Sequence, residues 1–319
     1  MKKITLNIIK TILFITVIWF IFNNVYSNLD RIKAVSYTNY DPKYLFFSVV
    51  MIFVALIYPV FVWKYLISIL GESIKTPAAM RIWFLSNLGR YIPGKVFQVA
   101  GLIYLSAREG IAKSKAVQSI LFSQITSNGL GLFMGLGLIS LQTGAEEFPN
   151  HFHIALILII IFILMLWFPS LIFRSSNFIL KKINKDQIDQ GVGKREYMIY
   201  LSLQIVNWML MSISLAFLVK SYTDLSITQN AEVLYVLPLS WTIGILAVFA
   251  PGGIGVREGA MSFWLSRFIP IEFALVLPWI HRIINTIAEV ILSVIFTVTY
   301  RKPETGIRKN DEQNTLKNS

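Results

Sequence analysis

Long apolar runs alternate with short polar segments along most of the chain. A helix that crosses a lipid bilayer needs roughly 20 apolar residues, and several of the runs reach that length. The pattern therefore predicts an all-α membrane protein with six spanning helices. The predicted spans are Ile8–Phe22, Tyr44–Leu70, Ala116–Leu141, His153–Phe173, Tyr197–Val219 and Phe273–Tyr300.

Two further apolar segments, Thr76–Ala107 and Glu232–Phe268, are interrupted by proline and glycine. Proline lacks a backbone N–H donor, and glycine allows the backbone to leave the helical conformation. In the second segment we expect one helix to end near Ala250 and the next to begin near Val256. Each segment is predicted to form a re-entrant hairpin, which enters and leaves the membrane on the same side. The residues expected at the two helix breaks are Pro93, Gly94, Pro251, Gly252, Gly253 and Gly255.

The distribution of basic residues predicts the orientation in the membrane. With the N-terminus in the cytoplasm and both hairpins re-entrant, cytoplasmic segments hold 19 Lys and Arg residues, if Lys10 at the start of the first span is included, and external segments hold five. This agrees with the excess of Lys and Arg in cytoplasmic loops of membrane proteins. An alternative with eight spans, in which Glu232–Ala250 crosses alone, keeps the same termini inside. For the first hairpin, the alternative is an interfacial helix followed by a tilted span.

The six-span arrangement divides the chain into two repeats of opposite orientation. Each half contains two spans, one broken hairpin and a further span, so the repeats cover about 1–141 and 153–300. In transporters, inverted repeats place the binding site near the middle of the bilayer, where the broken helices meet. Residues 1–300 are thus expected to form one membrane domain, and the polar residues 301–319 a disordered cytoplasmic tail.

Composition supports a membrane protein and excludes several other classes. Of the 319 residues, 55% are hydrophobic and 14% are charged, whereas about a quarter are charged in an ordinary soluble domain. The net charge of +12 is explained by basic cytoplasmic loops, and nucleic acid is not an expected partner. There is no cysteine, and the three histidines are scattered, so the sequence predicts neither a metal site nor a cofactor.

Ionisable residues lie beside the helix breaks and within the last predicted span. Arg282, Asn285 and Glu289 share one face of that span by helical spacing. A charged group at membrane depth costs at least ~2.5 kcal/mol on insertion scales, so it must pair with another group or face a wet cavity. We expect a cationic midplane cavity that binds the phosphate of a lipid headgroup. Its predicted binding residues are Arg90, Lys95, Arg257, Glu258 and Arg282, with Gln98, Gln124, Asn128, Asn285 and Glu289 in support.

The alternative interpretation of these charges is structural. Arg257–Glu258 and Arg282–Glu289 would then be internal ion pairs that hold the repeats together, and Gln98, Gln124 and Asn128 would join neighbouring helices. Neither pairing explains Arg90 or Lys95, which have no carboxylate nearby in the sequence.

The segments GRYIPGKVFQ, at Gly89–Gln98, and PGGIGVREG, at Pro251–Gly259, resemble two signature segments of the lysylphosphatidylglycerol synthase transmembrane, or flippase-like, family. The resemblance covers most of Leu45–Tyr300. It implies movement of a charged phospholipid between leaflets, with Arg90, Lys95, Arg257 and Glu258 lining the headgroup path. Full-length synthases continue into a soluble aminoacyl-transferase domain, which is not expected here because the chain ends 19 residues after the last span.

The sequence therefore favours a non-enzymatic, flippase-like translocase of a phosphate-bearing lipid in a bacterial-type plasma membrane. A membrane glycosyl or lipid transferase is the first alternative, but no convincing pair of catalytic carboxylates lies at either membrane surface. The second is a non-transporting partner of a separately encoded lipid-modifying enzyme. The oligomeric state is not predicted.

Overall fold

The computed structural model describes residues 40–91, 96–142, 192–247 and 250–300, with a few isolated positions outside these ranges. The predicted spans Ile8–Phe22 and His153–Phe173, and the tail 301–319, lie outside the described ranges. All regular secondary structure in the described part is helical. The α-helices are α3 (Pro42–Ile69), α4 (Thr76–Leu88), α5 (Val96–Arg108), α6 (Lys113–Gln142), α9 (Lys194–Tyr222), α10 (Ile227–Leu246), α11 (Val256–Leu265) and α12 (Ile271–Val298), and the short 3-10 turns are η1 (Gly89–Tyr91) and η2 (Pro251–Gly253).

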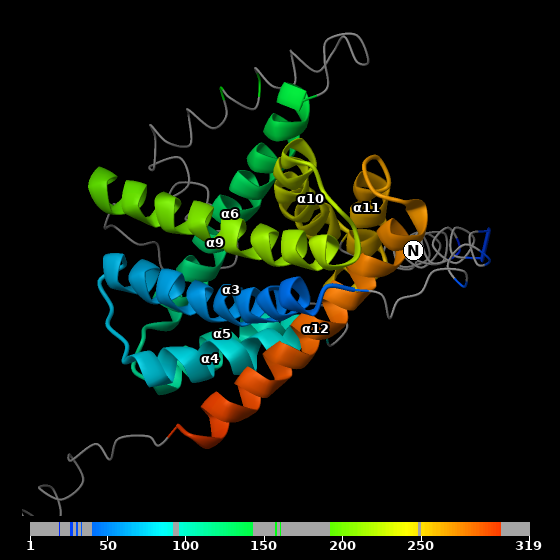
Figure 1. The fold of residues 1–319 in the computed structure, drawn as a ribbon. Helices are drawn as coiled ribbons and strands as arrows, with labels where there is room; N and C mark the ends of the chain where they lie inside the picture. The colour runs from blue at the N-terminus through cyan, green and yellow to red at the C-terminus, as the bar shows by residue number, and fades with distance from the viewer. Residues whose placement is uncertain are drawn as a thin grey trace, which may run out of the picture.

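The helices α3 and α9 form an antiparallel pair at the centre of the bundle (Figure 1). At one end, the backbone N–H of Asp41 donates to the carbonyl of Ser221, with an N–O distance of 2.8 Å. At the other end, the Tyr65 hydroxyl donates to the carbonyl of Glu196. Both helices are apolar because their packed faces bury large side chains in the core and their remaining faces carry exposed apolar residues.

The broken segments form two hairpins, α4 with α5 and α10 with α11, whose arms pack against each other. The Glu72 carboxylate, before α4, accepts from the backbone N–H of Ala112, after α5. The Gln229 side chain, at the start of α10, donates to the carbonyl of Phe268, after α11. Each hairpin therefore begins and ends at one end of the bundle. The first follows the end of α3 and the second follows the end of α9, so they open at opposite ends of this antiparallel pair.

The tip of the first hairpin is η1 and the tip of the second is η2, and these two 3-10 turns contact each other. Gly252 has a φ of +57°, which L-amino acids with side chains rarely adopt. A Cβ atom at Gly252 would lie 3.6 Å from the carbonyl oxygen of Arg90 in the other tip. The backbone turn at the second break thus brings the two tips into direct contact.

The bounds of α10 differ from the prediction at both of its ends. The helix ends at Leu246, before the expected Ala250, and it begins at Ile227, before Glu232. Its early start is set by a capping box, in which the Ser226 side chain accepts from the Gln229 N–H while the Gln229 side chain accepts from the Ser226 N–H. The next helix, α11, begins at Val256 as predicted.

The helix contacts follow a common pattern in the two halves of the chain. The helix α4 packs on α12, and α10 packs on α6; likewise α5 packs on α6, and α11 on α12. Both α3 and α9 contact α6 and α12. The pattern is unchanged when each helix of the first half is exchanged with its counterpart in the second: α3 with α9, α4 with α10, α5 with α11 and α6 with α12.

Three helices of the described part, α3, α9 and α12, are long and apolar enough to cross a membrane. A fourth, α6, has 30 residues but carries several polar side chains. The prediction of an all-helical membrane protein is confirmed. The arrangement of six spans and two re-entrant hairpins as inverted repeats stays a prediction.

The close approach at the second break can be tested by adding one methyl group. Gly253 has a φ of +68°, and a Cβ there would lie 2.9 Å from the carbonyl oxygen of Gly244. We expect Gly253→Ala to lower the free energy of unfolding by about 1–3 kcal/mol, because it adds both strain and a clash with backbone. The loss is measured as a fall in thermal unfolding temperature in detergent.

The matched control is Gly101→Ala within α5, where the nearest atom to a new Cβ would be at an ordinary 3.6 Å. Alanine is favoured over glycine inside a helix, so this variant should unfold at the same temperature or higher. Equal unfolding temperatures for the two variants would contradict the tight turn at Gly253.

Candidate functional site

A cavity of about 330 Å³ lies between the two hairpin tips and α12. Its walls come from α3, α4, α5, α6, α9 and α10 as well as from the tips. This volume falls within the range of small-molecule sites in proteins, about 300–1,000 Å³. The cavity combines apolar side chains with a cluster of charged and amide side chains. These polar side chains include most of the residues that the sequence predicted.

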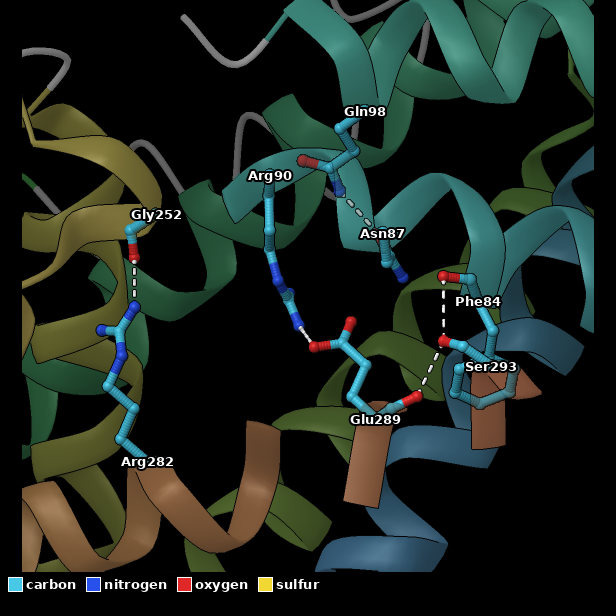
Figure 2. A network of polar contacts seen from close by, with 8 residues as sticks. All are labelled: Phe84, Asn87, Arg90, Gln98, Gly252, Arg282, Glu289 and Ser293. Carbon is cyan, nitrogen blue, oxygen red and sulfur yellow. Dashed lines mark hydrogen bonds and ion pairs between the residues drawn. The ribbon is translucent and has the colours of Figure 1, made fainter. Parts of the chain in front are cut away.

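Arg90 extends from the first tip to α12, where its Nη2 forms an ion pair with Oε2 of Glu289 (Figure 2). The Glu289 side chain is 1% exposed. One turn further along α12, the Ser293 hydroxyl donates to the carbonyls of Glu289 and Phe84. The ion pair and these hydrogen bonds join α12 to both the tip and the first arm of the hairpin.

Arg282 connects α12 to the second tip. Its Nη1 lies 2.5 Å from Oε1 of Glu258, and its Nη2 donates to the carbonyl of Gly252 (Figure 2 shows the second contact). Glu258 is fully buried, and its other oxygen accepts from the backbone N–H of Gly255 at 2.8 Å. The carboxylate therefore stabilises both the start of α11 and the guanidinium of Arg282.

The sequence suggested two structural ion pairs, Arg257–Glu258 and Arg282–Glu289. Both pairings are wrong. Glu258 pairs with Arg282, and Glu289 pairs with Arg90. Neighbouring residues on a helix point in directions about 100° apart, so Arg257 and Glu258 diverge. Arg282 and Glu289 share a face but lie about 10 Å apart along the axis, which is too far for a direct pair.

Arg257 stacks on Trp241 of α10, with its guanidinium carbon 4.2 Å from the ring centroid. Arg90 approaches the same ring, at 5.9 Å. Guanidinium groups are attracted to the face of an indole ring. Sequence reasoning missed Trp241, because nothing in the apolar pattern of α10 distinguishes a cavity-lining tryptophan from one that packs in the core.

The structure brings most of the predicted residues together. Glu258 pairs with Arg282 and is not among the residues that line the cavity, and Gly255 and Pro251 belong to the helix break. Lys95, Pro93 and Gly94 lie outside the described residues. The predicted residues that line the cavity are Arg90, Gln98, Gln124, Asn128, Gly252, Gly253, Arg257, Arg282, Asn285 and Glu289.

A family model for the lysylphosphatidylglycerol synthase transmembrane region matches residues 7–293. The chain belongs to this family. The match includes both helix breaks and the cavity-lining part of α12. No curated protein matches the chain. Membership of the lysylphosphatidylglycerol synthase family indicates a function related to membrane lipids.

The amide side chains that the sequence predicted at the site form hydrogen bonds both within one helix and between helices. The Gln98 side chain donates to Asn87 Oδ1 at 2.6 Å and so joins the two arms of the first hairpin (Figure 2). The Asn128 side chain donates to Gln124 Oε1 at 3.0 Å, one turn away on α6. Gln98 thus joins neighbouring helices, as the structural interpretation expected, whereas the α6 pair is internal to its helix.

The described charges leave the site cationic. Three arginines stand against two glutamates, and the arginines retain limited access to the cavity: the exposed fraction is 19% for the Arg90 side chain, 13% for that of Arg282 and 8% for Arg257. Buried guanidinium groups bind planar or tetrahedral oxyanions well, because their N–H groups form paired hydrogen bonds. No group of three or more His, Cys, Asp or Glu in the described residues could hold a metal ion.

The ion pair between the first tip and α12 makes a quantitative prediction. Arg90→Gln removes the guanidinium that pairs with the buried Glu289 carboxylate, so we expect it to lower the free energy of unfolding by about 3–5 kcal/mol. The double variant Arg90→Gln/Glu289→Gln removes both charges and should recover part of this loss. Unfolding of the two single variants and the double variant forms a double-mutant cycle.

We expect a coupling energy of about 0.5–3 kcal/mol between the two positions. The same cycle applied to Arg267 and Glu289, which make no contact in the structure, is the control. Additive effects for Arg90 and Glu289 would contradict the ion pair as a stabilising contact.

Proposed function

We propose that this protein moves a phosphate-bearing lipid, a phospholipid or a lipid-linked precursor, between the two leaflets of the plasma membrane. The observation that carries the proposal is the convergence of three arginines on one cavity within an otherwise apolar helical bundle. Charges are costly at membrane depth and usually mark the path of a substrate. An anionic headgroup would be attracted to these guanidinium groups.

A phosphate fits the donors better than a carboxylate does. The three guanidinium groups come from three different elements, η1, α11 and α12, so their N–H groups approach the cavity from different directions. A tetrahedral phosphate has three or four oxygens and can accept from several such donors at once. Apolar residues such as Leu56 and Leu102 line the same cavity and provide a surface for the hydrocarbon next to the headgroup.

The proposed transport mechanism uses two inverted repeats that rock around this cavity. The hairpins open at opposite ends of the α3–α9 pair, and the helix contacts exchange between the two halves. Both observations support two hairpins of opposite orientation. The proposed arrangement adds six spans, with both termini in the cytoplasm. Movement of one repeat against the other would expose the headgroup site first to one leaflet and then to the other.

The proposal describes a carrier and not an enzyme. The lipid would be made by a separately encoded lipid-modifying enzyme and would leave the cavity chemically unchanged. Purified protein that converts a lipid to a new product would place it instead among the membrane transferases.

The decisive variant is Arg257→Gln, which removes a cation from the cavity and leaves both described ion pairs intact. In liposomes containing the purified protein and fluorescent phosphatidylglycerol, we expect the rate of transfer between leaflets to fall about tenfold or more, the effect of losing one charge-assisted hydrogen bond. Transfer is followed by chemical quenching of the outer leaflet.

The control is Arg267→Gln, which removes an exposed arginine that stacks on Phe263 and Trp264 outside the cavity. It should transfer lipid at the wild-type rate. Unfolding temperatures of both variants show whether they are folded. Wild-type transfer by folded Arg257→Gln would remove this residue, and with it the cationic cavity, from the mechanism.

A further inference from the structure

A histidine of α12, His281, is fully buried beside the cavity without lining it. Its Nε2 lies 2.9 Å from the hydroxyl oxygen of Ser214 in α9, and that serine is also fully buried. Ionisable residues inside membrane helices are rare and commonly mark the path of a substrate, an ion or a proton. The described ion pairs of the site do not involve this ring, so its role has to be sought elsewhere.

The hydrogen bonds of Ser214 assign the tautomer of His281. A serine hydroxyl has one hydrogen, and here it donates to the carbonyl of Met211 at 2.6 Å. The same oxygen can therefore only accept from His281, so Nε2 carries the ring hydrogen and Nδ1 carries a lone pair. Nδ1 is buried and forms no hydrogen bond within the described part of the chain. His281 thus presents a buried basic nitrogen that can accept a proton.

Asn285 links this nitrogen to the cavity. It follows His281 by four residues, so the two side chains share one face of α12. Asn285 lines the cavity, and its Nδ2 is buried and unbonded among the described residues. The separation between the cavity wall at Asn285 and the imidazole is therefore one helical turn, about 6 Å along the axis.

Arg257 couples the charge of the ring to the charge in the cavity. Its guanidinium lines the cavity and also acts electrostatically on His281. Both groups would be positive, so a proton on the ring is unfavourable while the cavity holds no anion. An anion bound at Arg257 offsets the repulsion and favours the protonated ring. By linkage, a proton on the ring favours binding of the anion to the same extent.

The other charges on α12 and on the helices that contact it are engaged or distant. The two carboxylates near the hairpin tips, Glu258 and Glu289, pair with Arg282 and Arg90. The remaining described charges of these helices lie near helix ends or beside Tyr300: Lys43, Lys64, Arg81, Lys194, Arg195, Glu196, Lys220 and Glu272. Arg257 is therefore the charge through which a ligand in the cavity can act on His281.

We propose that His281 binds a proton at Nδ1 when an anionic headgroup occupies the cavity, and that the protein moves the lipid together with this proton. The ring becomes an imidazolium on one side of the membrane and returns the proton to water on the other. A phosphodiester carries one negative charge, so lipid and proton together add no net charge to the site. The membrane potential then neither opposes nor drives the step. This inference rests on the proposed function and adds a proton gradient as its source of energy.

Binding of fluorescent phosphatidylglycerol to the full-length protein in detergent tests the coupling at about pH 5.5, 7 and 8.5. The phosphodiester keeps its single charge throughout this range. Because binding takes up a proton, the affinity should be highest at low pH and weaken as the pH rises. We expect Kd to increase about tenfold or more from the lowest to the highest pH, as is typical of two coupled sites. A pH-sensitive dye in weak buffer should report uptake of a proton on binding.

The decisive variant is His281→Gln, which keeps a polar side chain beside Ser214 but cannot bind the proton. It should bind phosphatidylglycerol with one Kd at all three pH values. Ser214→Ala leaves the Nε2 hydrogen of the imidazolium without its acceptor, so the pH dependence should become smaller. The matched control is Ser212→Ala on the same helix, because Ser212 is equally buried but donates to the carbonyl of Leu234. It should behave as the wild type.

Unfolding temperatures show which variants are folded, and if His281→Gln is not, the comparison of Ser214→Ala with Ser212→Ala decides. A pH dependence that folded His281→Gln retains would assign the proton to another group, such as Glu258 or Glu289, and overturn the role of His281. In liposomes, a pH gradient that is acidic on the side of the labelled leaflet should accelerate transfer by the wild type and not by His281→Gln.

The outcomes distinguish this inference from the proposed function. If the wild type binds phosphatidylglycerol equally well at every pH, or transfers it at a rate that the gradient does not change, proton coupling is overturned and the lipid carrier remains. If the wild type binds no phosphatidylglycerol at any pH, the proposed function is overturned as well.

Discussion

The structure depends on providing hydrogen-bond and ion-pair partners inside an apolar helical bundle. The groups that need them are the charged side chains and the backbone groups at the two helix breaks. Each hairpin tip exposes carbonyl and N–H groups that have no helical partner, and lipid could not bond them. One helix, α12, supplies several of the side chains that bond these groups. Arg282 bonds the Gly252 carbonyl and the Glu258 carboxylate, and Glu289 receives Arg90. Both tips are thereby tied to the same helix, and the cavity between them follows from that arrangement.

Ion pairs between helices are easier to rearrange than apolar packing. An ion pair can exchange one oxyanion for another, whereas interlocked side chains must separate. In the proposed function a phosphate in the cavity competes with Glu289 for Arg90 and with Glu258 for Arg282. The described ion pairs would then hold the tips together in the absence of lipid, and the headgroup would take over part of their role. Arg257, held against Trp241, adds the cation that makes the site attractive to an anion.

Local rules predicted the helix breaks but not the contacts between distant segments. Pro251 and its glycines end one helix and start another through their own backbone preferences, and helical spacing placed Arg282, Asn285 and Glu289 on the cavity side of α12. The partner of Arg90 lies 199 residues away, so no local pattern could identify it. The early start of α10 was missed because the capping box at Ser226 precedes the apolar run that was used to place the helix.

A pseudo-symmetric scaffold does not require symmetric chemistry. Gln124 and Arg282 both line the cavity, and they lie on α6 and α12, two helices that exchange places in the pattern of helix contacts. Nothing in packing requires both to be charged, and a second arginine at Gln124 would lack the carboxylate that Arg282 finds in Glu258. The cost of burying an unpaired cation therefore favours a neutral side chain at position 124. Both halves still supply cations to the cavity, Arg90 from the first and Arg257 and Arg282 from the second, and neutral side chains occupy the positions around them.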